Sequence, residues 1–113
     1  MNSLPDTTSV IKTAYATSNT NTTTLTLNAI ADERHVIDWV IFSVDAKEGS
    51  KNHFTIRDST TNTTILRTTA PSGRPNELTF GGGLPFEINR SVVLQLVSSD
   101  TPTTNNNITV GYR

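Results

Sequence analysis

The sequence predicts an all-β protein: a two-layer antiparallel β-sandwich, jelly-roll-like, with a short extended N-terminal arm. Three observations favour this class. Short β-branched segments recur every 10 to 14 residues or so between Asn, Gly, Pro and Ser, whereas few windows carry the 3.6-residue apolar period of a helix. Thr (21), Asn (11) and Ser (10) make up 42 of the 113 residues, a composition that suits strands and turns. Ile, Leu, Val and Phe still number 28, which favours a folded core over disorder.

The chain length predicts a single folded domain. At 113 residues and 12.3 kDa it falls within the commonest size range of compact domains, about 100 to 150 residues. We expect residues 1–8 to form a polar arm and residues 9–113 to form one β-sandwich domain.

Eight or nine strands follow from the pattern. Leu25 and Leu27 alternate with Thr in the second, and Phe54 and Ile56 share one face of the fourth, so one side of each should meet the core. The Gly-rich segment 81–83 is expected to be a flexible turn between two short pieces. The expected strands are 9–16, 22–30, 35–45, 53–58, 63–68, 77–80, 84–88, 91–98 and 108–112. The expected core residues are Leu25, Leu27, Phe54, Ile56, Leu94 and Leu96.

Two of these strands carry apolar residues on both faces. In 35–45, strict alternation places Ile37, Trp39 and Ile41 on the side opposite Val40 and Phe42. The strand 91–98 repeats this more weakly, with Val93 and Val97 on its second side. A sandwich buries one face of each sheet, so the outer apolar set needs a cover. Either a loop or the N-terminal arm lies over it, or it forms an oligomer interface made of Ile37, Trp39, Ile41, Val93 and Val97.

Composition argues against several classes of partner. The formal charge is −1 and the pI is near 6.0, whereas nucleic-acid binders usually gather a basic surplus on one face. The longest apolar stretch, 36–44, has nine residues interrupted by Asp38, which is too short to cross a bilayer. No signal peptide pattern opens the chain. We therefore expect neither a nucleic-acid partner nor a membrane partner.

The residues offer little catalytic chemistry. His35 and Asp38 are three apart, which places them on opposite faces of a strand. Asp45 and His53 bracket a loop and are expected to be exposed polar residues. Cysteine is absent, and two histidines cannot complete a zinc site. We expect no catalytic residue, no metal and no cofactor. Trp39 lies in the middle of an apolar strand, which favours a core or interface position, and carbohydrate binding by stacking on its ring stays open as an alternative.

From His35 onward the chain resembles small β-sandwich proteins of tailed-bacteriophage particles. The segments that carry the resemblance are HVIDWVIFSV, FTIRDSTTNTTIL, FGGGLPFEI, SVVLQLVSS and a closing ITVGYR. The resemblance implies a capsid decoration, or cement, protein that stabilises the capsid surface as a trimer. Its partners would be other copies of the chain and the major capsid protein. Its location would be the virion, assembled in the bacterial host cytoplasm. A head-fibre, tail or host-attachment module is the alternative.

The N-terminal arm has one apolar anchor. Leu4 and Pro5 lie among Asn, Ser, Asp and Thr, and proline stiffens the chain into an extended form. The arm is either a frayed terminus or a segment, anchored by Leu4 and Pro5, that binds a neighbouring subunit or the capsid.

Overall fold

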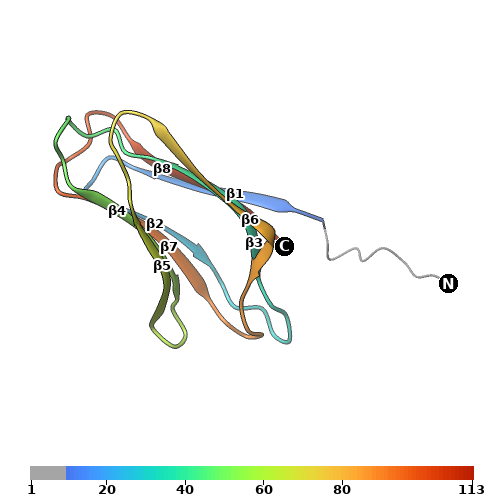
Figure 1. Ribbon diagram of the computed structural model, residues 1–113. Helices are drawn as coiled ribbons and strands as arrows, with labels where there is room; N and C mark the ends of the chain where they lie inside the picture. Colours follow the sequence, from blue (N-terminus) through green and yellow to red (C-terminus); the bar gives the residue numbers. More distant parts are fainter. Residues whose placement is uncertain (1–9) are drawn as a thin grey trace.

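The computed structural model describes residues 10–113, which form two four-stranded antiparallel sheets packed face to face (Figure 1). The predicted arm, with Leu4 and Pro5, lies outside the described residues. The strands are β1 (Lys12–Ser18), β2 (Thr22–Leu27), β3 (Val36–Ser43), β4 (Asn52–Asp58), β5 (Thr63–Thr69), β6 (Pro75–Pro85), β7 (Val92–Ser98) and β8 (Asn106–Tyr112).

The strand order is that of a jelly roll. One sheet runs β1-β8-β3-β6 and the other β2-β7-β4-β5, so consecutive strands pass from sheet to sheet except between β4 and β5, which form a hairpin. Eight strands in two sheets wound as paired Greek keys define this architecture. The predicted fold class is therefore confirmed.

The six predicted core residues are all buried between the sheets. Phe42 of β3 and Phe54 of β4 stack across the core, with ring centroids 4.2 Å apart and an interplanar angle of 8°. Burying a Phe or Leu side chain fully contributes about 1.5–3 kcal/mol. This core accounts for the alternation that Leu25, Leu27 and their counterparts show in the sequence.

A β-bulge in β3 changes which residues face inward. Ile37 pairs with Tyr112 and Trp39 with Gly111, so Asp38 is an extra residue in the ladder. The alternation therefore restarts after Asp38. Ile37 faces the core and is fully buried, while Trp39 faces outward. The prediction that Ile37 shares the outer face with Trp39 is wrong because it assumed unbroken alternation.

β6 is one strand rather than two pieces. Its register against β3 jumps from Thr79 opposite Trp39 to Leu84 opposite Ile37, so the Gly-rich segment bulges out of the ladder. Gly82 and Gly83 have φ of 80° and 90°, a region that glycine reaches without strain. The predicted turn at 81–83 is therefore wrong: these glycines form a bulge within a continuous edge strand.

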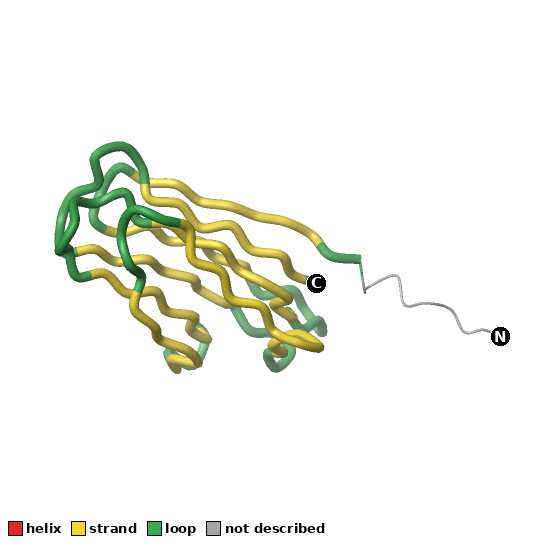
Figure 2. Tube along the Cα trace, turned by 45° about the horizontal axis from the view of Figure 1, so that its top comes forward, coloured by secondary structure: helices red, strands yellow, loops and turns green. Residues whose placement is uncertain are grey.

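The loops lie at the two ends of the sandwich (Figure 2). At one end, Asp45 accepts hydrogen bonds from the backbone N–H and the hydroxyl of Thr104, which joins the β3–β4 and β7–β8 loops. At the other end, Arg90 donates to Asp58 at 2.6 Å and joins the β6–β7 loop to β4. Both ends therefore hold segments that are distant in sequence, and they leave the two outer sheet faces as the broad surfaces of the molecule.

Candidate functional site

The outer face of β1-β8-β3-β6 carries aromatic and aliphatic side chains. Tyr15 is 75% exposed and Ile41 is 36% exposed, and both lie in one cross-strand row, with Thr109 of β8 between them. Trp39 lies in the next row. We call this surface the aromatic face. Its outward residues are Thr13, Tyr15, Thr17, Trp39, Ile41, Ser43, Glu77, Thr79, Asn107, Thr109 and Gly111.

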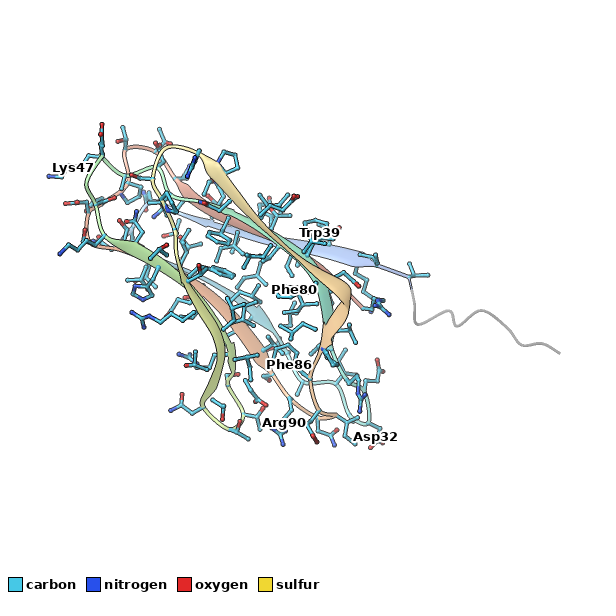
Figure 3. The ribbon with its side chains drawn as sticks, viewed as in Figure 1. Asp32, Trp39, Lys47, Phe80, Phe86 and Arg90 are labelled. Atoms are coloured by element: carbon cyan, nitrogen blue, oxygen red, sulfur yellow. The ribbon has the colours of Figure 1, made fainter. Side chains whose placement is uncertain are left out.

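Trp39 lies over the backbone of Gly111. A Cβ placed on Gly111 would come within 2.3 Å of the indole Cε2 and 2.4 Å of Nε1, so the ring occupies the space that any side chain would need. Figure 3 shows Trp39 on the outer side of the sheet, while Phe80 and Phe86 lie toward the space between the sheets. Among residues 10–113, no acceptor pairs with the indole N–H. The glycine thus gives the indole a flat support on the sheet.

The charges at the border of the aromatic face are largely neutralised. Arg113 donates from Nε and Nη2 to both carboxylate oxygens of Asp38 at 2.9–3.2 Å, a bidentate arrangement. Glu77 is exposed on β6. The ion pair therefore neutralises the border near Trp39, whereas Glu77, directly opposite Ile41, places one carboxylate on the aromatic face.

The outer face of β2-β7-β4-β5 is different in chemistry. Half of its outward residues are threonines, and it carries Arg57, Arg67 and His53 with no carboxylate among its outward positions. Burial, and then the charge of Arg67, lower the pKa of His53. We call this surface the arginine face. Its outward residues are Thr22, Thr24, Thr26, His53, Thr55, Arg57, Thr64, Arg67, Thr69, Val93, Gln95 and Val97.

The structure does not bring the five predicted interface residues together. Trp39 and Ile41 lie on the aromatic face, whereas Val93 and Val97 lie on the arginine face at the opposite side of the sandwich. Val93 is only 8% exposed and so offers little surface, and Ile37 is in the core. No single patch holds all five. Their role in an interface remains a prediction for Trp39, Ile41 and Val97.

Sequence reasoning missed Tyr15 and the two arginines. The signal for Tyr15 was present in KTAYATS, where Ala14 and Ala16 are small inward residues that leave Tyr15 facing out. The placement of Arg57 and Arg67 on the same face depends on how β5 pairs with β4. This register shifts between Ile56 and Arg57. That shift has no local sequence marker.

The titratable residues discussed in the sequence analysis lie in different parts of the fold. Asp45 binds Thr104 at a loop end, His53 lies on the arginine face, and His35 is buried with Nε2 2.7 Å from the carbonyl of Asn28. Within residues 10–113, no cluster of three or more His, Cys, Asp or Glu side chains could hold a metal ion. The same part of the chain contains no helix long and apolar enough to cross a membrane.

These features define the class of the chain: residues 10–113 form an eight-stranded jelly roll with two chemically distinct outer faces. No protein-family model matches the sequence, and no curated protein matches it. Among solved structures, similar chains come from infectious bursal disease virus. The Gt strain structure has a TM-score of 0.39 at 16% identity, covering 99% of this chain and 34% of that one.

Two further structures give comparable values. A mutant VP2 protein of infectious bursal disease virus, in derived T=1 particles, has a TM-score of 0.39 at 16% identity and is covered over 33% of its length. The Gx strain structure has a TM-score of 0.39 at 12% identity, covering 96% of this chain and 33% of that one. The present chain spans about a third of the length of these proteins. Scores at this level are too low to transfer function.

Proposed function

We propose that this chain is a non-enzymatic structural protein of a viral particle that decorates and stabilises a bacteriophage capsid as a homo-oligomer. The observation that carries the proposal is the aromatic face, where Tyr15, Trp39 and Ile41 lie exposed or half-buried and Glu77 is the one charged residue among the outward positions. Tyr and Trp are enriched in protein interfaces, and exposed apolar groups of this kind mark interaction sites. The kind of particle, a bacteriophage capsid, is taken from the sequence resemblance to proteins of phage particles.

The size of the aromatic face sets the expected strength of association. Four strands of about seven residues cover roughly 23 Å by 19 Å, or about 440 Å² in projection. Stable complexes bury about 800 Å² per partner. Contact through this face alone should be weak in dilute solution and should strengthen where copies are held side by side on a particle.

The proposed partners follow from the same surface. A trimer, favoured by the resemblance, would bury an equivalent part of the aromatic face on each copy. The major capsid protein is the second proposed partner, with the virion surface as the location and the bacterial host cytoplasm as the site of assembly. Head-fibre or tail placement is the alternative within the same class.

Sedimentation equilibrium and capsid co-sedimentation test the proposal. The variant Tyr15→Ser/Ile41→Thr should lower both self-association and the amount bound to emptied phage capsids. Ile65→Thr is a matched control, because Ile65 is 45% exposed on β5 of the other sheet. Equal behaviour of the double variant and the wild type in both assays would overturn the proposal.

A carbohydrate-binding or host-attachment module is the second candidate. The observation that favours it is Trp39, whose ring covers Gly111 with Thr79 and Thr13 at the neighbouring cross-strand positions, because sugar rings stack on such aromatic side chains. Trp39 is the single tryptophan of the chain, so its fluorescence reports directly on this site. A saturable change in emission on titration with bacterial surface glycans, abolished in Trp39→Ala, would favour this candidate over the decoration protein.

A further inference from the structure

We infer that the arginine face binds a short, extended, carboxylate-rich protein segment, with Arg57 and Arg67 as its anchoring residues. The inference rests on the proposed function only for the source of that segment, the capsid shell. The binding chemistry is carried by the arginine face itself.

Arg57 and Arg67 are neighbours on one face of the β4–β5 hairpin. Arg67 pairs in register with Thr55 and Arg57 with Thr64, so the two arginines occupy a diagonal of the ladder. Diagonal positions lie roughly 7–8 Å apart. Two like charges at this separation with no carboxylate between them oppose folding, which favours a binding role over a stabilising one.

Neither arginine is neutralised within the described chain. Among residues 10–113, the ion pairs join Lys47 to Asp100, Arg90 to Asp58 and Arg113 to Asp38, and none includes Arg57 or Arg67. The Nε of Arg57 is moreover buried without an acceptor. An N–H in this position gains most from an acceptor that a ligand would bring.

The surroundings of the two arginines suit a carboxylate. Thr55 and Thr64 lie directly across the ladder from them and offer hydroxyl donors, and Gln95 lies beside Thr55. His53 lies on the same face, and burial, followed by the charge of Arg67, lowers its pKa. Guanidinium groups bind carboxylates bidentately, and these bonds are stronger than those between neutral groups.

The spacing selects an extended peptide. In an extended segment, side chains two residues apart face the same way and are separated by about 6.6–6.8 Å. This matches the separation of about 7–8 Å expected for the two arginines. A Glu-x-Glu segment would therefore present one carboxylate to each guanidinium.

The distribution of acids argues for a short acidic segment rather than a nucleic acid. Asp32, Glu33 and Glu87 lie in loops at one end of the sandwich, and Asp45 and Asp100 lie at the other. Basic residues in the same loops, Arg34 and Arg90 at the first end and Lys47 and Lys51 at the second, balance these acids without exceeding them, so a long polyanion would meet no surplus of positive charge beyond the arginine face. Nucleic-acid binding also relies on many phosphate contacts, whereas this face has two arginines.

Fluorescence anisotropy with a dye-labelled peptide Thr-Glu-Thr-Glu-Thr-Glu-Thr tests the inference on the full chain. We expect saturable binding that weakens with added salt. Arg57→Gln/Arg67→Gln should weaken binding by about tenfold, as expected for the loss of two charge-assisted contacts at a partly exposed surface. Arg74→Gln, an exposed arginine in the β5–β6 loop, is the matched control and should leave binding unchanged.

Three outcomes would overturn the inference. One is equal binding of a peptide in which Gln replaces each Glu, and another is equal affinity of the double variant and Arg74→Gln. The third is tighter binding of a thymidine oligonucleotide than of the Glu peptide, which would make phosphate the ligand. Melting curves of the variants check that the fold is retained. Peptide binding without capsid binding would refute the proposed function and leave this inference standing, and the reverse result would refute only the inference.

Discussion

The two outer faces of the sandwich differ in chemistry although the same strand pattern builds both. Each has threonine at many outward positions, but the aromatic face adds Tyr15, Trp39 and Ile41, while the arginine face adds Arg57 and Arg67. Our proposals give the first face an apolar or stacking partner and the second an acidic one. Inward residues thus determine the fold, whereas the proposed binding of each face depends on a few outward residues.

The largest expected effect on folding stability comes from a change in the core between the two sheets. Phe54→Ala removes half of the stack with Phe42 and leaves a cavity between the sheets, so it should lower the free energy of unfolding by about 3–5 kcal/mol. Urea denaturation followed by circular dichroism measures this. Both faces should lose binding together. Loss at one face alone would show that the sheets are less coupled than their shared core indicates.

A smaller loss of folding stability is expected when the hydrogen bond between Arg90 of the β6–β7 loop and Asp58 of β4 is removed. Burial of Asp58 would by itself raise its pKa, but hydrogen bonds from Arg90, Thr61 and Thr60, with the charge of Arg90, outweigh burial and lower it. Asp58→Asn should cost about 1.5–3 kcal/mol at neutral pH, the range for a hydrogen bond to a charged group.

The pH dependence of this loss has a definite sign. Because the folded pKa of Asp58 lies below its ordinary value of 3.8, the carboxylate stabilises the fold above that pH, and its contribution disappears as the pH falls through the folded pKa. The stability difference between the wild type and Asp58→Asn should therefore shrink in acid. A difference that stays constant from pH 7 to pH 2 would contradict this account.

Gly111→Ala should affect the aromatic face alone. The new methyl group would overlap the indole of Trp39, so the ring must leave its support, at a cost of about 1–3 kcal/mol. We expect a shift in tryptophan emission and weaker self-association, with acidic-peptide binding unchanged. If self-association survives the displacement of Trp39, the interface does not depend on that ring.

The smallest expected effect concerns the arginine face. Arg67→Gln removes one of the two causes that lower the pKa of His53, so that pKa should rise toward 6.5 while stability changes by less than about 0.5 kcal/mol. An NMR titration of the two histidine rings measures the shift. An unchanged His53 pKa would mean that Arg67 does not contribute to the field at this face.

How well each feature could be predicted from the sequence depends on how far apart in the chain the interacting residues lie. Core residues such as Leu94 and Ile56 were predictable because alternation is a local property of a strand. Ile37 was not, because the bulge at Asp38 is set by pairing with β8, some 70 positions later in the chain. The arginine pair was missed for the same reason, since it depends on the register of β5 against β4. Trp39 and Ile41 were recognised as surplus apolar residues, although their face was not resolved from that of Val97.

The edge strands β5 and β6 affect whether copies of the chain can pair strand to strand. β6 begins and ends with proline, which cannot donate to a neighbouring strand, and the glycine bulge interrupts its ladder in between. β5 is irregular next to Arg57 and carries the positive charge of Arg67. Such edges discourage strand-by-strand polymerisation. Pairing between copies is thus disfavoured along the β5 and β6 edges, whereas the opposite edge strands, β1 and β2, contain neither proline nor a register shift.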